Sequence, residues 1–387
     1  MNIIESVEAI HEELIKHRRH IHSNPELSFK EFKTSEYIKS VLSDLEIENK
    51  IIAETGVVGL IGSGDKCVAL RADMDALPIQ EETGLSYSSG KDGIMHACGH
   101  DMHVAMLLGA AKILKENESE LDGTVKLIFQ PGEEKLPGGA KILIEEGVLD
   151  NPTPQAVFGQ HIYPEAPTGT ISIAPGFIMA APDELYWTIH GKGGHAAQPH
   201  HNNDAILAAS NLVVFLKSML TKYKNPVSHG ILSVTAIHGG NATNVFPDEV
   251  KLMGTFRSFD ENWRVFMHEE IRKRSQEICH LYNTECTVEI LKGYPPVFNT
   301  PEKVDFIRDI AAGLLGTESV LNFEPKMWGE DFAYYAQKVP AAFWFLGVRQ
   351  RDKNHIPALH NAKLAPDEEA LIYGTVLFVE TAMRLFK

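Results

Sequence analysis

Short apolar runs separated by helical stretches constrain the fold of this 387-residue chain more than any other feature. The runs are bounded by Gly, Pro or Asp, and they lie at residues 57–61, 67–72, 125–129 and 156–159. Helical stretches at 104–114 and 140–149 fall between some of them. Continuous apolar runs of this length are typical of strands buried on both faces of a largely parallel sheet that is covered by helices.

A second pattern occupies residues 183–294. Its expected order is strand, helix, strand, strand, helix, strand, at 185–190, 204–220, 230–237, 250–256, 261–280 and 285–291. This is the order of the split βαβ unit. An apolar strand expected at 341–346 is long enough to rejoin the first sheet. We therefore predict an α/β fold in which residues 1–182 and 295–387 form a mostly parallel sheet flanked by helices. Residues 183–294 are predicted to be an inserted α+β, ferredoxin-like domain.

The composition limits the classes of partner. With 36 Lys+Arg against 52 Asp+Glu, the formal net charge is −16, which argues against nucleic acid or an anionic membrane as a partner. Four cysteines are too few for a disulfide framework in a chain of this length and indicate a reducing compartment. The first residues lack the basic start and apolar core of a signal peptide, so a cytoplasmic protein is expected.

The segment His96-Ala97-Cys98-Gly99-His100-Asp101-Met102-His103 concentrates three imidazoles, a thiol and a carboxylate. Neutral imidazole and thiolate are ligands that suit zinc and its first-row neighbours, and Cys98 and His100 are close enough in sequence to reach one metal from a turn. The alternative is a loop with a buried cysteine whose histidines cap the following helix. Further candidate ligands elsewhere in the chain favour the metal site.

Polar side chains follow several of the expected strands. Asp73 and Asp75 follow the second run, Glu133 and Glu134 the third, and His161 the fourth. Because ligands bind outside the carboxyl ends of the strands in open α/β sheets, these side chains are expected at one edge. Adjacent glutamates point in different directions, so one can bind metal while the other takes a proton from water. An exposed acidic pair at a helix start is the alternative.

His161 and His360 would singly be more typical of hydrogen-bonded core residues. Together with Cys98, His100 and Glu134, however, they make five candidate metal donors. A tetrahedral zinc ion binds four ligands, and a thiolate or carboxylate can bridge two ions. Two divalent metals, roughly 3.5 to 4 Å apart, are therefore the expected cofactors.

The inserted domain carries three further candidates. His195 follows the glycines of Gly191-Lys192-Gly193-Gly194, although such a loop can be a simple connection between elements. Asn244 and Arg257 border expected strands. An arginine can bind a carboxylate through two hydrogen bonds, whereas most single arginines at a strand edge are only surface residues.

This set of motifs resembles the amidohydrolase branch of the aminoacylase and glutamate-carboxypeptidase-like di-metal peptidases. In pattern it is most similar to hippurate hydrolases, N-acyl-amino-acid amidohydrolases and plant indole-acetyl-amino-acid hydrolases. The resemblance covers nearly the whole chain. It rests on the Cys-Gly-His-Asp motif, the Glu-Glu pair, the Gly-Gly-His loop, His360 and the segments Arg18-Arg19-His20-Ile21-His22, Pro25-Glu26-Leu27-Ser28, Arg71-Ala72-Asp73-Met74-Asp75-Ala76-Leu77-Pro78 and Gly329-Glu330-Asp331-Phe332-Ala333.

The resemblance implies that residues 1–182 and 295–387 form the catalytic, metal-binding domain. In that domain, Cys98 would bridge two metals, with His100 and His161 completing one site and Glu134 and His360 the other. The inserted domain would be a lid and a dimerisation domain.

The resemblance also implies roles in the reaction. Glu133 would be the general base that activates water. His195 would stabilise the oxyanion, usually in the active site of the partner subunit of a dimer, with help from Asn244. Arg257 would hold the α-carboxylate of the substrate.

The branch departs from the wider family, which has an aspartate at the position of Cys98. The wider family also takes an early histidine ligand from the motif that here reads Asp73-Met74-Asp75. Asp73 and Asp75 are therefore expected around the ligands rather than among them. The metals could be Zn, Mn, Co or Ni, because a thiolate is a softer bridge than a carboxylate.

The expected function is hydrolysis of the amide bond of N-acyl-L-amino acids, such as N-acetyl amino acids or hippurate, by a homodimer that binds neither nucleic acid nor membrane. A dipeptidase or an N-acetyl-diaminopimelate deacetylase would use the same machinery. A non-catalytic binding protein on this fold would have lost the base or a ligand, yet Glu133 and all five donors are present.

Overall fold

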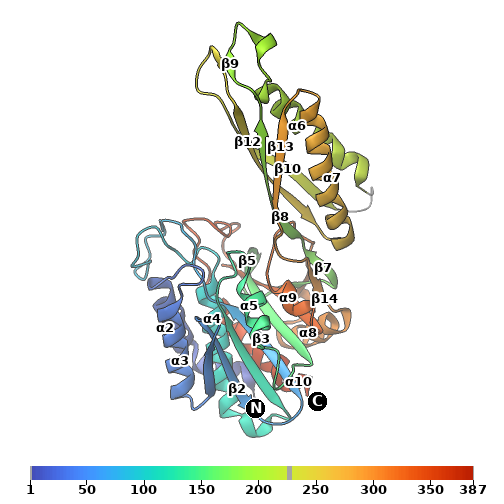
Figure 1. Ribbon diagram of the computed structural model, residues 1–387. Coiled ribbons are helices and arrows are strands. Elements are labelled where there is room, and N and C mark those ends of the chain that lie inside the picture. Colours follow the sequence, from blue (N-terminus) through green and yellow to red (C-terminus); the bar gives the residue numbers. More distant parts are fainter. Residues whose placement is uncertain (1, 225–228, 387) are drawn as a thin grey trace. The chain divides into compact units, whose positions relative to one another are not determined.

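The computed structural model describes residues 2–224 and 229–386. The chain divides into two compact units, whose elements Figure 1 labels. Unit 1 comprises Met1–Ile178, Phe298–Pro325 and Asp331–Lys387, and unit 2 comprises Met179–Val297 and Lys326–Glu330. Residues 326–330 belong to unit 2 because Lys326 pairs with Met179 and Gly329 lies against the ring of Pro182. The catalytic and lid roles of the two parts stay predictions.

Unit 1 is built on one large sheet. Its strand order is β1-β2-β4-β3-β5-β16-β6-β15. The bounds are β1 Glu48–Ile52, β2 Gly56–Gly62, β3 Cys67–Asp73, β4 Thr124–Gln130, β5 Ala156–Pro167, β6 Ile171–Ile173, β15 Val320–Asn322 and β16 Ala341–Arg349. Every residue of β3 and β4 is buried, which accounts for their continuous apolar runs.

The parallel part of this sheet is its centre, where β4, β3, β5 and β16 run in the same direction. The strand β2, however, pairs antiparallel with β4. The loop between β2 and β3 explains this direction, because residues 63–66 are far too few for the crossover that parallel strands need. The predicted α/β fold with a mostly parallel sheet is confirmed, with antiparallel pairs toward its edges.

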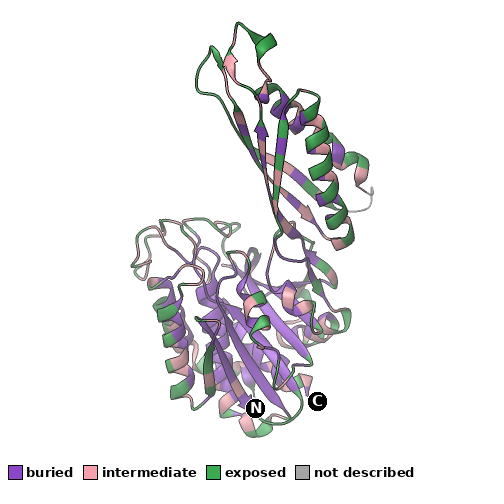
Figure 2. Ribbon diagram, viewed as in Figure 1, coloured by how far each residue is buried: buried purple, intermediate pink, exposed green. Residues whose placement is uncertain are grey.

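Helices cover the sheet of unit 1, and Figure 2 shows the strands between them as buried. Their bounds are α1 Ile3–Ala9, α2 His11–Ser23, α3 Phe32–Asp44, α4 His100–Glu116, α5 Gly139–Glu145, α8 Pro301–Leu315, α9 Ala333–Ala336 and α10 Ala370–Leu385. Short 3₁₀ turns lie at Glu118–Glu120 and Thr317–Ser319. The helix α4 is buried along nearly its whole length and packs against α2 and α10. The fold thus places the start of a buried helix beside the carboxyl ends of the central strands.

Unit 2 contains a four-stranded antiparallel sheet of order β10-β12-β8-β13. Its elements are β8 Ala181–His190, α6 Ala205–Tyr223, β10 Gly230–His238, β12 Glu249–Ser258, α7 Glu261–His280 and β13 Glu285–Leu291. Both helices start at an aspartate that caps them, since Asp204 accepts the N–H of Leu207 and Asp260 that of Trp263. The chain order and the sheet order are those of a split βαβ unit.

Smaller elements complete the chain. A two-stranded ribbon joins β9, Gly194–His195, to β11, Val245–Phe246, and a 3₁₀ turn lies at Pro199–His201. A second ribbon joins β7, Gly176–Met179, to β14, Val297–Asn299.

Within the described ranges, α6 is the one helix that is long and apolar enough to cross a membrane. Its Leu212, Leu216 and Met219 are buried in the core of unit 2, whereas Val214 is 71% exposed. Length and composition of this kind also occur in the core helices of soluble proteins, so they are weak evidence for a membrane.

A buried ion pair fixes one end of unit 2. Asp183 is fully buried and accepts hydrogen bonds from Arg264, from His268 and from the N–H of Gly293. We expect Asp183→Ala to lower the free energy of unfolding of unit 2 by about 3–5 kcal/mol, because it removes the buried carboxylate that neutralises Arg264 and leaves that guanidinium paired with the partly exposed Glu261. Urea unfolding followed by circular dichroism measures this.

The exposed pair formed by Lys251 and Glu249 on β12 is the control for that substitution. Lys251→Ala should change the unfolding free energy by less than about 1 kcal/mol, since solvent screens such pairs. Equal effects of Asp183→Ala and Lys251→Ala would contradict the assignment of a buried, structural ion pair.

Candidate metal centre

The five predicted donors come together in unit 1. Cys98 and His100 lie at the start of α4, Glu134 follows β4, His161 lies in β5, and His360 lies in the loop before α10. Their donor atoms form two groups, Cys98 with His100 and His161, and Cys98 with Glu134 and His360. Within each group the atoms lie within 4.8 Å of one another. Cys98 is the member that the two groups share.

The backbone around Cys98 is shaped to present these donors. Gly99, which precedes α4, has φ +83, in the left-handed region that favours glycine. A Cβ on Gly99 would come within 2.2 Å of the side chain of Ile162, so the helix start packs directly onto β5. His360 also has a left-handed φ of 62, and its N–H donates to the carbonyl of Ala97 at 2.8 Å. These contacts tie together three segments that are distant in sequence.

Hydrogen bonds orient the imidazoles. Nδ1 of His100 lies 3.1 Å from Oδ1 of Asp75, and Nδ1 of His161 lies 2.8 Å from the carbonyl oxygen of Ile162. Each ring therefore donates through Nδ1, which leaves the lone pair of Nε2 for a metal. Nε2 of His161 lies 3.3 Å from Sγ of Cys98. Both imidazoles are thus oriented by their Nδ1 atoms, with Nε2 on the side of the donor cluster.

Two buried polar atoms of the cluster have no hydrogen-bond partner among the described residues, Nε2 of His100 and Oε1 of Glu134. Nε2 of His360 lies 3.1 Å from that same oxygen of Glu134, but the contact lacks hydrogen-bond geometry. Unsatisfied buried donors and acceptors are costly in a folded protein. Divalent cations in contact with these atoms would remove this cost, so these residues fit a metal centre.

The charges of the cluster favour a cation as well. Burial lowers the pKa of His100, but the carboxylates of Asp73, Asp75 and Glu134 outweigh burial and raise it to about 10. Burial, followed by the charge of Glu134, raises the pKa of the Cys98 thiol well above its usual value. Negative charge therefore sets the direction of the His100 pKa shift and adds to the effect of burial on the pKa of Cys98. A divalent cation supplies the positive charge and displaces the protons of these two groups.

Glu133 is buried, with 7% of its surface exposed, and groups with His100 and Glu134. It is thus adjacent to the donors without belonging to either group that contains the thiol. This is the position that a proton acceptor for a water molecule at the metals requires.

Asp73 and Asp75 have different partners. Asp75 contacts His100 through one oxygen and accepts the N–H of Glu134 through the other, at 3.0 Å. Asp73 instead pairs with Arg71 at 2.6 Å and with His103 at 2.5 Å, and its nearer oxygen lies 3.7 Å from Nε2 of His100. Asp75 therefore orients a donor directly, whereas Asp73 acts on neighbours of the donors.

Sequence reasoning assigned no role to several residues that support the site. His103 stands three positions after His100 on α4, accepts the N–H of Ile162 and bonds to Asp73, so its spacing on the helix was the available signal. Arg71 links Asp73 to Gln130 and Asp331. All of these residues are buried.

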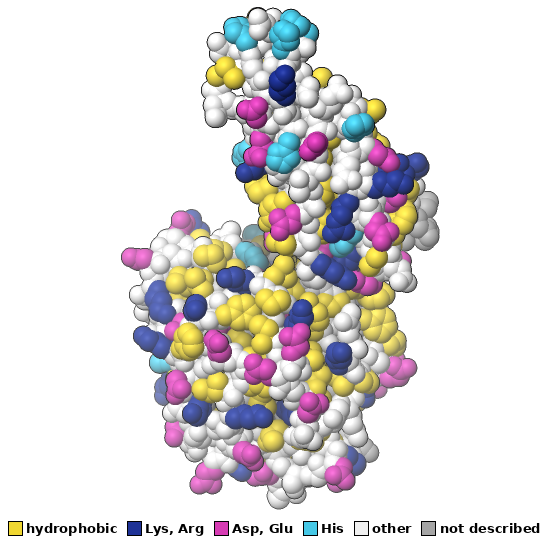
Figure 3. Space-filling model, viewed as in Figure 1, with side chains coloured by type: hydrophobic (Ala, Val, Ile, Leu, Met, Phe, Trp, Pro, Cys, Tyr) yellow, Lys and Arg dark blue, Asp and Glu magenta, His cyan; other side chains and the backbone are white. Residues whose placement is uncertain are grey.

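The three candidates in unit 2 fall into two places. His195 and Asn244 lie close together, because His195 pairs with Val245 and the N–H of Ala196 donates to the carbonyl of Asn244 at 3.0 Å. His195 and Asn244 are exposed, and Figure 3 shows histidines gathered at the end of unit 2 where Figure 1 labels β9. Arg257 lies on β12 and donates to Oγ1 of Thr255 at 3.0 Å.

Arg257 stands at the opposite end of the unit 2 sheet from the ribbon that holds His195. On β12, Arg257 is opposite Pro182, whereas Glu249 is opposite His190, from which the chain runs on to the ribbon. From Glu249 to Arg257 is eight residues, roughly 27 Å at about 3.4 Å per residue. One chain therefore does not bring His195 and Arg257 to the same amino-acid-sized ligand.

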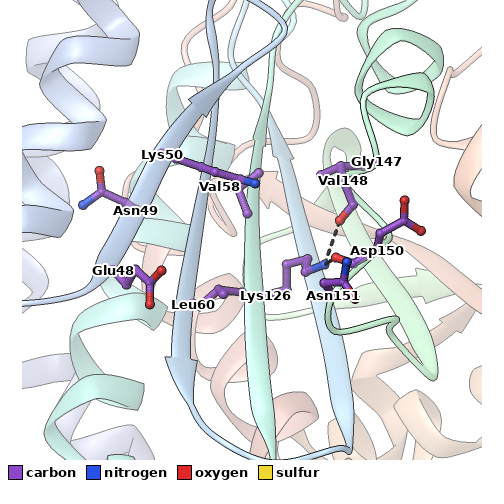
Figure 4. A pocket seen from close by; sticks show the side chains of 10 residues that line it. All are labelled: Glu48, Asn49, Lys50, Val58, Leu60, Lys126, Gly147, Val148, Asp150 and Asn151. Carbon is purple, nitrogen blue, oxygen red and sulfur yellow. Dashed lines mark hydrogen bonds between the residues drawn. The ribbon is translucent and has the colours of Figure 1, made fainter.

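A cavity of about 170 Å³ in unit 1 is a separate feature, and none of the five donors lines it (Figure 4). Lys126 reaches into its wall and donates to three carbonyls, those of Val148, Asp150 and Pro152, each at 2.8 Å. Those bonds use all three protons of the ammonium group. Lys126 therefore anchors the loop after α5 and has no proton left for an anionic ligand.

Comparisons with known proteins agree with this geometry. The sequence model of peptidase family M20/M25/M40 matches residues 69–384. Thermostable carboxypeptidase 1 of Saccharolobus solfataricus is 39% identical over 384 residues, covering 98% of this chain and 96% of the relative. N-acetyl-L-cysteine deacetylase of Bacillus subtilis is 40% identical over 383 residues, covering 98% and 90%.

A solved structure is similar over nearly the whole chain. The Bacillus subtilis YXEP protein, described as a dinuclear metal binding peptidase from the M20 family, matches with a TM-score of 0.84 and 35% identity. The match covers 98% of this chain and 99% of that protein. The chain therefore belongs to peptidase family M20/M25/M40.

Proposed function

We propose that the protein is a metal-dependent amidohydrolase that cleaves the amide bond of N-acyl-L-amino acids. The observation that carries the proposal is the position of Cys98, which belongs to two donor groups at once while Glu133 lies beside them. The similarity to a dinuclear metal binding peptidase supports two divalent ions per subunit. The similarity to N-acetyl-L-cysteine deacetylase supports an N-acyl amino acid as the substrate.

The residues of the chain divide the reaction between them. Divalent cations held by Cys98, His100, His161, Glu134 and His360 would polarise the amide carbonyl and lower the pKa of water. Glu133 takes the proton of the attacking water, and then gives it to the leaving nitrogen. The water oxygen first adds to the carbonyl carbon, and the carbonyl oxygen becomes an oxyanion. When that adduct collapses, the C–N bond breaks, so the products are a carboxylic acid and a free amino acid.

Residues of unit 2 complete the proposed machinery. The N–H of Ala197 donates to Nδ1 of His195 at 3.0 Å, so the proton of the neutral ring is on Nε2. The Nε2–H of His195 and the side chain of Asn244 are the proposed donors to the oxyanion. Arg257 is proposed to bind the α-carboxylate of the substrate through its planar fork.

The separation of His195 and Arg257 supports a homodimer in which His195 serves the partner subunit. Unit 2 also offers a surface for such a dimer. In the described part of unit 2, β10 is an edge strand, with exposed Ile231 and Ile237. A hollow of about 580 Å³ between α6 and β10 is lined by residues that include Val213 and Val214. A second copy that pairs along this edge would cover both the backbone and the apolar side chains.

A mixed dimer tests this arrangement. Glu133→Gln and His195→Ala homodimers should each be nearly inactive, because each lacks one essential group in both of its sites. After subunit exchange, about half of the dimers are mixed, and each mixed dimer has one complete site of two, so about a quarter of wild-type activity returns. Equal inactivity before and after exchange, with exchange verified by mass spectrometry, would show that His195 does not act across the dimer.

A substrate panel tests the proposed reaction. Purified protein reloaded with zinc, manganese, cobalt or nickel is offered hippurate, N-acetyl amino acids, N-acetyl-diaminopimelate and unblocked dipeptides. We expect the highest kcat/KM on blocked amino acids, loss of activity on chelation and recovery on reloading. A preference for unblocked dipeptides would identify a dipeptidase. Absence of turnover on every substrate at full metal occupancy would instead identify a binding protein.

We also propose a cytoplasmic location. All four cysteines are buried and free, which suits a reducing compartment.

A further inference from the structure

The turn that carries Glu133, residues 131–134, is hydrogen-bonded to a loop about a hundred residues earlier in the chain, residues 28–31. One link runs through Asp75 and the other is direct. Ser28 donates to Oδ2 of Asp75 at 2.6 Å, and the same oxygen accepts the N–H of Glu134. The N–H of Gly132 donates to Oε1 of Glu31 at 2.9 Å. Carboxyl groups thus bind the peptide that follows Glu133 and the Pro131–Gly132 peptide one residue before it.

Glu31 makes this contact with a fully buried side chain, whose exposed fraction is 0%. Its Oε1 accepts a second N–H, that of Phe29, also at 2.9 Å, and its Oε2 accepts the hydroxyl of Thr55 at 2.9 Å. Glu31 stands immediately before α3, but its side chain does not cap that helix. Its hydrogen-bonding capacity is therefore directed to the turn and the loop rather than to the helix.

The two backbones that Glu31 joins are in unusual conformations. Gly132 has φ +59 and Phe29 has φ +63, both in the left-handed region. A Cβ on Gly132 would lie 2.3 Å from the ring of Phe29, so only glycine allows this approach. Non-glycine residues pay for a left-handed conformation unless the surroundings impose it. One oxygen of Glu31 accepts the N–H of both residues, and so holds both conformations.

Burying a carboxyl group costs free energy that an apolar side chain at the same place would not cost. Among the described hydrogen bonds, Glu31 is compensated by two N–H groups and one hydroxyl. The buried carboxyl of Glu31 lowers stability and is hydrogen-bonded close to the proposed base. This combination is typical of a residue kept for function.

We propose that Glu31 is a positioning residue for Glu133, acting by binding the N–H of Gly132 and so fixing the Pro131–Gly132 peptide, one residue ahead of the base. This inference rests on the proposed amidohydrolase function. Proton transfer requires the base within hydrogen-bond distance of its partner, and a displacement of about 1 Å costs on the order of 10²-fold in rate. Glu31 itself touches no reacting atom.

Three variants separate the effect of the length of the Glu31 side chain from the effect of its charge. Glu31→Ala removes the acceptor, Glu31→Asp keeps the charge but shortens the side chain, and Glu31→Gln keeps an acceptor oxygen at the same reach without the charge. We expect Glu31→Ala and Glu31→Asp to lower kcat on the order of 10²-fold with a much smaller change in KM. Glu31→Gln should restore most of kcat. Zinc content of the reloaded protein should stay at the wild-type value in all three.

The matched control is Thr55→Val, which removes the hydroxyl that donates to Glu31 and leaves the hydrogen bonds from Gly132 and Phe29 in place. It should lower the melting temperature while kcat stays at the wild-type value. If Glu31→Ala does not fold, the kcat values of Glu31→Asp and Glu31→Gln test the proposal without it.

The proposal would be overturned by a wild-type kcat in Glu31→Asp. A Glu31→Gln variant as slow as Glu31→Asp would overturn it as well. Inactivity of the wild-type protein on every blocked amino acid would instead refute the amidohydrolase function.

Discussion

Glu133→Gln is expected to lower kcat by about 10²–10⁴-fold, the range that a general acid and base contributes, while the metal content stays unchanged. Glutamine has nearly the shape of glutamate but cannot take a proton from water. Glu133 lies outside both donor groups that contain Cys98, so its substitution leaves all five donors in place. Steady-state kinetics on N-acetyl amino acids, with metal content measured by atomic emission, checks both parts.

The neighbouring glutamate supplies the control. Glu134→Gln alters a donor of the group that contains His360, so it should reduce both the metal content and the activity. The two adjacent carboxylates would then differ in what they do to the metals. Near-normal turnover in Glu133→Gln, or loss of metal in that variant, would mean that Glu133 is not the base.

Cys98→Ala should have the second large effect, loss of both metals and of activity. The thiol belongs to both donor groups, so its removal leaves each group with only two side chains. Cys98→Asp replaces the sulfur by a harder donor that can still bridge. We expect that variant to recover metal with a preference shifted from zinc toward manganese. Metal content and activity after reloading with each ion measure the outcome.

Cys67→Ala is the control for that substitution, because Cys67 is also fully buried, on β3, but belongs to none of the donor groups. It should lower stability through the small cavity it leaves and keep the metal content of the wild-type protein. Retention of two ions in Cys98→Ala would refute the shared thiol as the basis of the site.

The sequence predicted the sheet well where burial controlled the residue types. Strands such as β3 and β4 are buried on both faces, so their apolar runs are continuous and easy to locate. The direction of β2 was less accessible, since an apolar run carries no information on whether its neighbour is parallel. The length of the following loop carried that information instead.

The candidate site was predictable as residue types more than as contacts. Thiol, imidazole and carboxylate groups are common metal ligands, so their residue types alone indicate a metal site. The structure brings together the five predicted donors, Cys98, His100, Glu134, His161 and His360. Their roles stay predictions until tested. Glu31 carried no such signal, because glutamate before a helix is ordinary and its partner Gly132 contributes only a backbone N–H. A contact with a backbone N–H cannot be predicted from the type of the residue that carries it.

The strand order of unit 1 has a consequence for synthesis on the ribosome. In the sheet, β16 lies between β5 and β6, although β5 and β6 follow one another in the chain and β16 comes only after unit 2. A nascent chain that has emerged only through unit 2 lacks the strand that joins them. The adjacent strands β1, β2, β4, β3 and β5 all precede unit 2, but the part of the sheet beyond β5 must wait for the C-terminal segment, which also delivers His360. Completion of the sheet and completion of the donor set are thus late, coincident events in translation.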